Sequence, residues 1–333
     1  MIRIGISGCG AVAQLYYRPA LQALSSDGEA VLAGAFDPDP AAAKRLCDGF
    51  PDARPVGSLD ELLARQIDLL IVASPPARHA EQARLAIAAG VAVLCEKPMA
   101  LTVADARRMA QEARAGAPPF AVGMVRRFLP QPRMIREMLS SRALGELRRI
   151  DIFEGGPFDW PVTSASYFDP RRGAGGVLED VGVHVLDLLR WWLGEPDAVE
   201  FADDSMGGVA ANCRIDLRFG STDVAVRLSR DWHRPNGYRF IGADGWLHWA
   251  IHERDELELG SPAEPVGVSI PLPDDERAVA GYPAAIAAQI RAMAGAIRGN
   301  ADARLVSAED GLGTIYLIEQ CRQSRVPMAM EWL

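Results

Sequence analysis

The chain has 333 residues, of which 49% are hydrophobic and 24% are charged, so its length suggests about two domains of ordinary globular composition. Its formal net charge is −9, from 35 basic and 44 acidic residues, which argues against a nucleic-acid groove and against a polybasic membrane anchor. The opening residues lack the pattern of a secretory signal, and apolar runs such as 69–73 are too short to span a bilayer. Five scattered cysteines without a CxxC pair indicate a reducing compartment, so we expect a cytoplasmic protein with no metal site.

The first third of the chain alternates short apolar runs with helical stretches. Near-continuous apolar strands in a β-α-β pattern predict a parallel sheet covered by helices on both faces. The expected strands are 2–7, 30–36, 68–73, 91–95 and 120–124, and the expected helices are 11–25, 39–48, 59–65, 79–89 and 103–115. Residues 1–124 are therefore predicted to form a doubly wound α/β domain.

The pattern changes after about residue 125 and becomes rich in strands. The turns between them are marked by Gly220-Ser221, Asn236-Gly237 and Asp244-Gly245, which favours an antiparallel sheet. The expected strands are 147–154, 207–219, 222–231, 236–241, 246–252 and 255–259, and the expected helices are 131–140, 177–192, 283–298 and 307–322. Residues 125–333 are thus predicted to form an α+β domain.

A glycine-rich turn joins the first strand to the first helix. Its sequence is Gly8-Cys9-Gly10-Ala11-Val12-Ala13, a GxGxxA pattern in which the glycines allow a tight turn and a close approach of the backbone to a pyrophosphate. The free N–H groups of the following helix N-terminus suit the same anion. Asp37 ends the second strand, where a carboxylate accepts both ribose hydroxyls of NAD and repels the 2′-phosphate of NADP. We therefore expect a Rossmann domain that binds NAD in preference to NADP, with Asp39 as a candidate helix N-cap.

Two further segments carry groups suited to proton transfer. Glu96-Lys97-Pro98 follows the strand 91–95, at the carboxyl end where ligands bind in such sheets. Asp180 and His184 are four residues apart in a predicted helix that follows the glycine-rich loop 173–176, so they share one helical face. Asp187 continues that face, and we interpret it as structural.

On these motifs the chain resembles the glucose–fructose oxidoreductase / inositol dehydrogenase / rhizopine-catabolism (Gfo/Idh/MocA) oxidoreductase family. The matching motifs are GCGAVA at 8–13, Ser74-Pro75-Pro76 with His79, EKP at 96–98 and GGxxxDxGxHxxD at 175–187. The resemblance implies a Rossmann domain followed by a substrate-binding domain on a large, mostly antiparallel open sheet, through which a homodimer or homotetramer would form. It also implies NAD(P)-dependent redox chemistry on a sugar, cyclitol or related polyol. The family often shows Thr-Pro-Asn where this chain has Ser74-Pro75-Pro76, so a contact from that Asn side chain is not expected.

The resemblance also implies the residues of the site. Lys97, Asp180 and His184 are the expected catalytic residues: His184 as acid and base, Lys97 as support for charge on the substrate oxygen, and Asp180 as a group that orients His184 or holds a substrate hydroxyl. The expected cofactor contacts come from Gly8, Cys9, Gly10, Ala11, Val12, Ala13, Asp37, Ser74, Pro75, His79, Glu96 and Lys97. We further interpret His79 as a residue that holds its loop in place.

Substrate contacts are expected from Arg127, Tyr167 and His233, which lie near the domain junction or in loops. His248 and His252 are four residues apart in an expected strand, where they span roughly 13 Å and do not chelate one ion. Two alternatives to the dehydrogenase stay open from the sequence. One is a glycosidase that uses transient oxidation by a tightly held NAD, and the other is a non-catalytic NAD-binding sensor.

Overall fold

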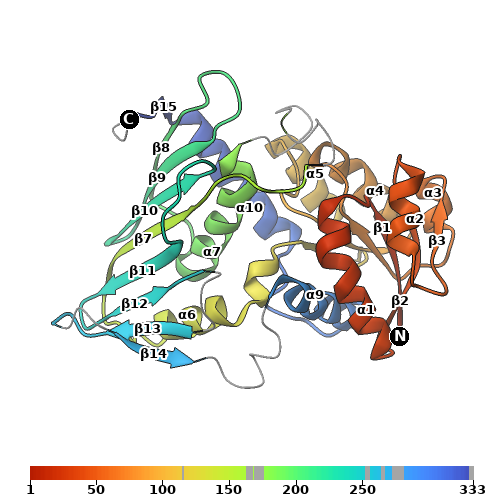
Figure 1. The fold of residues 1–333 in the computed structure, drawn as a ribbon, viewed down its shortest axis with the longest axis horizontal. Helices are drawn as coiled ribbons and strands as arrows, with labels where there is room; N and C mark the ends of the chain where they lie inside the picture. Colours follow the sequence, from red (N-terminus) through yellow and green to blue (C-terminus); the bar gives the residue numbers. More distant parts are fainter. Residues whose placement is uncertain are drawn as a thin grey trace. The chain divides into compact units, whose positions relative to one another are not determined.

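The computed structural model describes residues 1–114, 116–162, 168, 176–251, 256–263, 267–271 and 281–329 (Figure 1). These residues divide into two compact units. The first comprises the described residues within Met1–Phe128, Pro161–Ala174 and Gly281–Ile315, and the second those within Leu129–Trp160, Gly175–Ala280 and Tyr316–Leu333. Residues 281–315, close to the end of the chain, thus fold with the first unit.

The first unit is built on a six-stranded sheet in which every pairing is parallel, in the order β3-β2-β1-β4-β5-β6. This order confirms the predicted doubly wound fold. The chain winds outward from β1 in both directions, so the carboxyl ends of β1 and β4 form the switch point where ligands bind in such sheets. The strands are β1 (Ile2–Ser7), β2 (Ala30–Phe36), β3 (Arg54–Val56), β4 (Leu69–Val72), β5 (Ala92–Cys95) and β6 (Phe120–Val122).

Local capping explains where several helices of the first unit begin. Asp39 accepts a hydrogen bond from Ala41 N at 3.0 Å, and Ser58 and Thr102 cap their helices in the same way. The predicted helix 11–25 is in fact a π-helical turn followed by an α-helix. The helical elements are η1 (Ala13–Tyr17), α1 (Arg18–Ser26), α2 (Pro40–Cys47), α3 (Leu59–Leu63), η2 (Pro76–Arg78), α4 (His79–Ala88), α5 (Val103–Glu112), η3 (Val125–Phe128) and α9 (Tyr282–Ile297).

The second unit is built on a nine-stranded sheet in the order β14-β13-β12-β11-β7-β10-β9-β8-β15. The pairs β7–β10 and β8–β15 are parallel and the other pairs are antiparallel, which confirms a large, mostly antiparallel sheet. The strands are β7 (Leu147–Gly155), β8 (Ala198–Asp203), β9 (Asn212–Phe219), β10 (Thr222–Ser229), β11 (Gly237–Gly242), β12 (Trp246–Trp249), β13 (Glu256–Gly260), β14 (Val268–Pro271) and β15 (Arg325–Pro327).

One of the three predicted turns does not join neighbouring strands. Gly220-Ser221 and Asp244-Gly245 connect antiparallel neighbours, as predicted. Asn236-Gly237 was expected to do the same, but β7 lies between β10 and β11 and pairs with both. Asn236 instead accepts a hydrogen bond from Gly155 N, the last residue of β7, at 2.6 Å, so it ties β7 to the start of β11. Strand β7, from earlier in the chain, thus lies between the two strands of the predicted hairpin, and local turn residues do not reveal such an insertion.

Helices cover one face of this sheet. They are α6 (Pro130–Ser140), the π-helical turn η5 (Leu178–Gly182), α7 (Val183–Leu193) and the second half of α10 (Ala308–Gln323). Trp192 of α7 donates to Pro132 O of α6 at 3.0 Å and packs edge-on against Tyr238 and Phe240 of β11, with ring centroids 5.9 and 5.4 Å away. α7 therefore joins the sheet to α6 (Figure 1).

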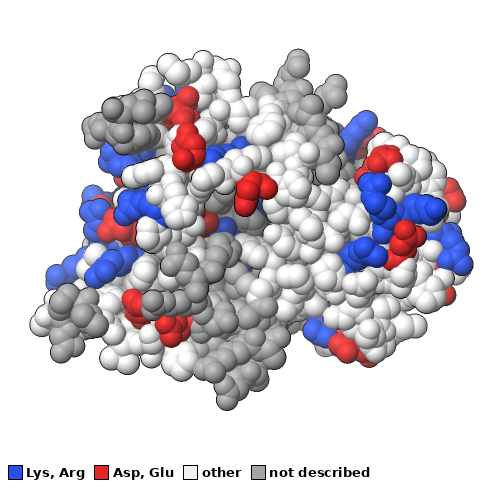
Figure 2. Space-filling model, in the orientation of Figure 1, with Lys and Arg blue, Asp and Glu red and all other residues white. Residues whose placement is uncertain are grey.

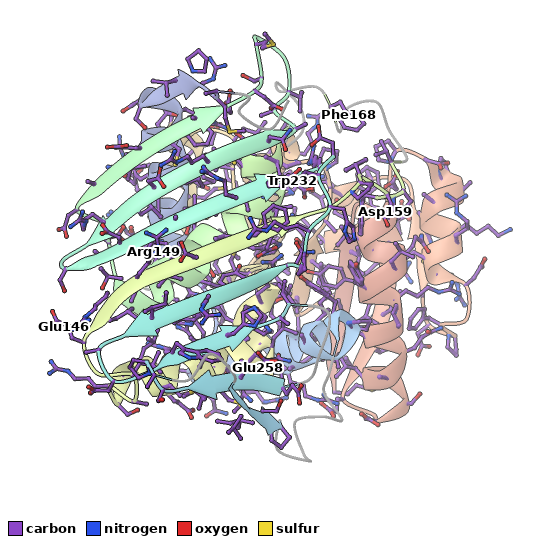
Figure 3. The ribbon with its side chains drawn as sticks, turned by 60° about the vertical axis from the view of Figure 1, so that its left-hand side comes forward. Glu146, Arg149, Asp159, Phe168, Trp232 and Glu258 are labelled. Atoms are coloured by element: carbon purple, nitrogen blue, oxygen red, sulfur yellow. The ribbon has the colours of Figure 1, made fainter. Side chains whose placement is uncertain are left out.

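The opposite face of the sheet carries ion pairs. Arg149 pairs with Asp151 along β7, and Arg218 on β9 pairs with Asp223 on β10, each at 2.6 Å (Figure 3). On the face of the molecule drawn in Figure 2, basic and acidic side chains likewise lie interleaved. No helix in the described part of the chain is both long and apolar enough to cross a membrane.

Candidate functional site

The glycine-rich turn after β1 lies directly against the end of β4. Gly8 has φ +95°, and a Cβ placed on it would lie 2.3 Å from Ser74 N and 2.4 Å from the carbonyl carbon of Ala73. Gly8 N also donates to Phe36 O at 2.8 Å, which ties the turn to the end of β2. Only glycine fits this position, both for its backbone conformation and for the space around it. The absence of a side chain at Gly8 therefore lets the turn pack directly against the end of β4.

The helix that follows begins with small residues. Gly10, Ala11 and Val12 are partly exposed, whereas Ala13 is fully buried at the start of η1. Gln14 donates to Cys9 O and Ala42 O at 3.1 and 3.2 Å and so fixes the turn to α2. The backbone N–H groups at this helix N-terminus suit an anionic group.

Asp37 lies at the mouth of the glycine-rich turn. Its Oδ2 accepts from Cys9 N at 2.7 Å and its Oδ1 accepts from Asp39 N at 2.8 Å, while the residue itself stays partly exposed. A carboxylate oxygen can accept more than one hydrogen bond, so capacity for a ligand hydroxyl remains. The sequence reasoning missed Arg45 of α2, which reaches Asp39 at 3.7 Å. Its position in the last turn of α2 gave no signal in the sequence.

Cys9 is inert despite its place in the turn. It is 1% exposed, and burial, with Asp37 beside it, raises the pKa of its thiol far above the ordinary value. The thiolate is the reactive form of cysteine, so this side chain fills space and offers no nucleophile.

His79 joins the loops after β4 and β5. Its Nε2 lies 2.8 Å from Ser74 O and its Nδ1 lies 3.0 Å from Pro98 O, and the side chain is fully buried. Ser74 also donates from Oγ to Gln82 Oε1 at 2.8 Å, which holds the same loop to α4. Burial lowers the pKa of the imidazole below its ordinary value of 6.5. His79 therefore supports the shape of two loops at the switch point.

The Glu96 side chain is hydrogen-bonded to Tyr17 and to the Lys97 backbone. Its Oε1 accepts from Tyr17 Oη at 2.7 Å and its Oε2 accepts from Lys97 N at 3.1 Å. Burial raises the pKa of this carboxyl, and it raises the pKa of Tyr17 as well. A Cβ on Gly123 would approach Glu96 to 3.2 Å, so the β6 end packs closely on it. Lys97 itself is partly exposed at the carboxyl end of β5.

Asp180 and His184 lie in the second unit, whereas Lys97 belongs to the first. The predicted helix 177–192 is in fact η5 running directly into α7, with Asp180 in the π-helical turn and His184 in the first turn of α7. Single π-turns occur frequently at functional sites. Asp180 is partly exposed, His184 is 8% exposed and Asp187 is 1% exposed. The structure brings Asp180 and His184 together on one helical segment.

Sequence reasoning missed Arg230, which pairs with Asp180. Its Nη2 donates to Asp180 Oδ2 at 2.9 Å, and its side chain is 8% exposed. A signal was available, because residues 224, 226 and 228 of β10 are the buried positions of an alternating strand and Arg230 continues them. An arginine at a buried strand position is uncommon and calls for a partner.

The expected substrate residues have different environments. Arg127 is 4% exposed in η3, beside Arg126, which donates from Nε to Tyr282 Oη at 3.2 Å. His233 is exposed after β10, next to Trp232, which packs edge-on against Phe153 at 5.5 Å (Figure 3). Tyr167, Gly173, Gly175 and His252 lie outside the described residues.

No described residues form a group of three or more His, Cys, Asp or Glu that could hold a metal ion. His248 lies 3.6 Å from Glu258 on the neighbouring strand, between Nδ1 and Oε2.

Two family models match the chain. One describes an oxidoreductase family with an NAD-binding Rossmann fold and matches residues 2–124, and the other describes the Gfo/Idh/MocA C-terminal domain and matches residues 133–248. The chain belongs to the Gfo/Idh/MocA oxidoreductase family. It is thus an NAD(P)-dependent oxidoreductase, as the motifs around Gly8, Lys97 and His184 predicted.

Curated relatives agree with this membership. The rhizopine catabolism protein MocA of Rhizobium meliloti is 30% identical over 246 residues, which cover 67% of this chain and 73% of the relative. The inositol 2-dehydrogenase of Rhizobium meliloti (strain 1021) is 27% identical over 195 residues, or 58% of this chain and 56% of the relative.

Solved structures share the fold. A levoglucosan dehydrogenase in complex with NADH and levoglucosan superposes with a TM-score of 0.84 at 19% identity, covering 97% of this chain and 96% of that one. A myo-inositol dehydrogenase from Corynebacterium glutamicum superposes with a TM-score of 0.76 at 24% identity, covering 98% and 96%.

Proposed function

We propose that the chain transfers a hydride between a nicotinamide dinucleotide and a secondary alcohol or ketone of a sugar, cyclitol or related polyol. The observation that carries the proposal is the Gly8 turn against the end of β4 with the Asp37 carboxylate at its mouth. Several relatives are named inositol dehydrogenases and one is named D-apiose dehydrogenase, which supports a polyhydroxylated substrate. In this proposal residues 1–124 bind the cofactor, and residues 125–333 bind the substrate and form the oligomer.

The residues at the switch point fit a dinucleotide. A tight turn that Gly8 allows against the end of β4, a helix N-terminus after it and an acidic side chain at the end of β2 suit a pyrophosphate and an adjacent ribose. His79 would act through the two loops that it joins. The proposed contacts come from Gly8, Cys9, Gly10, Ala11, Val12, Ala13, Asp37, Ser74, Pro75, Glu96 and Lys97.

The bound nicotinamide supplies the hydride acceptor or donor. The chain's own residues handle the proton and the charge. His184 takes the hydroxyl proton when the alcohol is oxidised and returns it when the ketone is reduced, because an imidazole is suited to both steps near neutral pH. The Lys97 ammonium group stabilises negative charge that develops on the substrate oxygen. Asp180 orients His184 or accepts a hydrogen bond from a neighbouring substrate hydroxyl.

NAD is the preferred cofactor in this proposal. The Asp37 carboxylate would accept hydrogen bonds from ribose hydroxyls and repel a 2′-phosphate. Arg127, Tyr167 and His233 are proposed to contact the substrate, as hydrogen-bond donors that suit hydroxyl groups.

We also propose a homodimer or homotetramer that forms through the nine-stranded sheet. The face opposite α7 carries partly exposed, oppositely charged pairs such as Arg149 with Asp151 and Arg218 with Asp223. A two-fold axis on such a face can bring positive groups of one copy against negative groups of the other. Light scattering on the purified chain tests this, and a monomer at micromolar concentration would refute it.

The experiment that tests the function follows absorbance at 340 nm with purified protein, NAD or NADP, and a panel of inositols, aldoses and sugar acids. Steady formation of the reduced cofactor with one polyol, and with NAD in preference to NADP, is the expected result. A cofactor that binds but is not turned over by any member of the panel would refute the dehydrogenase.

A further inference from the structure

Two arginines hold the π-helical turn that carries Asp180. Arg230, which directly follows β10, donates from Nη2 to Asp180 Oδ2 at 2.9 Å. Arg322, on α10, donates from Nη2 to Glu179 Oε1 at 2.9 Å and from Nε to the same oxygen at 3.2 Å. Consecutive residues of a helix face different sides, so the two ion pairs fix different sides of the turn. Of the two acids, Asp180 alone belongs to the proposed catalytic set.

Arg230 is held in place by contacts other than its ion pair. Its backbone N donates to Ala211 O at 2.9 Å and its backbone O accepts from Phe158 N at 2.8 Å. Its guanidinium carbon lies 5.0 Å from the centroid of the Phe158 ring. An ordered guanidinium gives up little further conformational freedom when it binds a carboxylate. The position of Arg230 therefore determines where the Asp180 carboxylate lies.

We infer that Arg230 is a positioning residue of the proposed reaction, acting through Asp180. This inference rests on the proposed function. An arginine stays charged wherever the protein is folded, so its partner is held as a carboxylate that accepts hydrogen bonds and does not donate them. Asp180 in that form, fixed in place, can orient the His184 ring or accept from a substrate hydroxyl. Arg230 touches neither substrate nor cofactor in this account.

The inference predicts that substitutions at Arg230 and Asp180 are not additive. Arg230→Gln should lower kcat about 10- to 100-fold, since small displacements of a catalytic group have effects of that size. The Kd for the cofactor, measured by fluorescence titration, should change less than about 2-fold, since Arg230 acts only through Asp180. In the Asp180→Asn background, Arg230→Gln should lower kcat by less than about 3-fold, because the group through which it acts is already gone.

Arg322→Gln is the matched control, because it removes the other arginine from the same turn. If both arginines serve only the fold, any loss of kcat should follow the loss of stability to urea in both variants. The inference predicts instead that Arg322→Gln keeps kcat within about 3-fold of the wild type. Arg230→Lys keeps the charge without the planar guanidinium, so it should retain more kcat than Arg230→Gln. If the glutamine variant does not fold, Arg230→Lys replaces it in the comparison with Asp180→Asn.

Equal losses of kcat in the wild-type and Asp180→Asn backgrounds would overturn the inference, and so would equal losses in Arg230→Gln and Arg322→Gln. These results leave the proposed function standing, because the wild-type protein still turns over. A wild-type protein without turnover on any polyol would overturn the proposed function, and this inference with it.

Discussion

A methyl group at Gly8 should disrupt the packing of the glycine-rich turn against the end of β4. Its carbon would lie 2.3 Å from Ser74 N and 2.5 Å from Ala73 O, about 1 Å inside ordinary contact distance. These are backbone atoms, and Ala73 N donates to Ser7 O at 2.7 Å, so the end of β4 is held against the end of β1. A positive φ costs a non-glycine residue about 1–2 kcal/mol. Overpacking adds about 1–3 kcal/mol.

Gly8→Ala is therefore expected to lower the free energy of unfolding by about 2–5 kcal/mol, measured by urea denaturation. Gly28→Ala is the matched control, since Gly28 has φ +70° with no atom within 4 Å of its Cβ position, and it should lose only about 1–2 kcal/mol. The Kd for NAD should rise at least about 10-fold in Gly8→Ala and stay unchanged in Gly28→Ala, because a displaced turn no longer presents its N–H groups. Equal stability losses in the two variants, with NAD affinity kept in both, would refute this reasoning.

Three further results are expected. Because burial lowers the pKa of His79, the unfolded chain binds more protons than the folded chain between that pKa and 6.5, so the free energy of unfolding should rise as the pH rises through this window. The contribution is at most about 1.4 kcal/mol per pH unit, and urea unfolding of His79→Gln at several pH values should show a shallower slope. In Asp37→Ser the ratio of kcat/KM with NADP to kcat/KM with NAD should rise at least about 10-fold. Adding Arg45→Ala should reverse part of that gain. An unchanged ratio in Asp37→Ser would count against the role of Asp37. All five cysteines are buried, so a thiol reagent should label the folded protein only slowly and label five thiols in urea; rapid labelling of the folded chain would contradict the burial.

The sequence predicted those features of the fold that depend on neighbouring residues in the chain. The glycine pattern at 8–13 requires a strand before it and a helix after it, and the cap at Asp39 accepts a hydrogen bond from the N–H group two residues away. Strands β3, β8, β14 and β15 escaped prediction because most of their residues are not buried, so they lack an apolar pattern. The insertion of β7 between β10 and β11 depends on pairing across more than 70 residues, which no local pattern encodes.

The features that the sequence did not predict depend on contacts between distant segments of the chain. The helix near 283–298 was predicted, but its place in the first unit depends on partners such as Glu29, which pairs with Arg291 at 2.7 Å, and Tyr16, which stacks on Tyr282 at 5.4 Å. Asp180 and His184 could be placed on one helix from their spacing. The partner of Asp180 follows a strand 50 residues later, and only the buried position of Arg230 in the alternating pattern of β10 hinted at it.

The most direct test of the central claim compares kcat/KM of the wild type and His184→Asn at 340 nm, with the polyol that the panel identifies. Val185→Ala is the control, because Val185 is the next residue of α7 and is also buried, so it reports any general effect of disturbing this helix. We predict that His184→Asn lowers kcat/KM about 10²- to 10⁴-fold with NAD affinity unchanged, while Val185→Ala stays within a few-fold of the wild type. A His184→Asn variant that keeps wild-type kcat/KM would contradict the assignment of proton transfer to this helix.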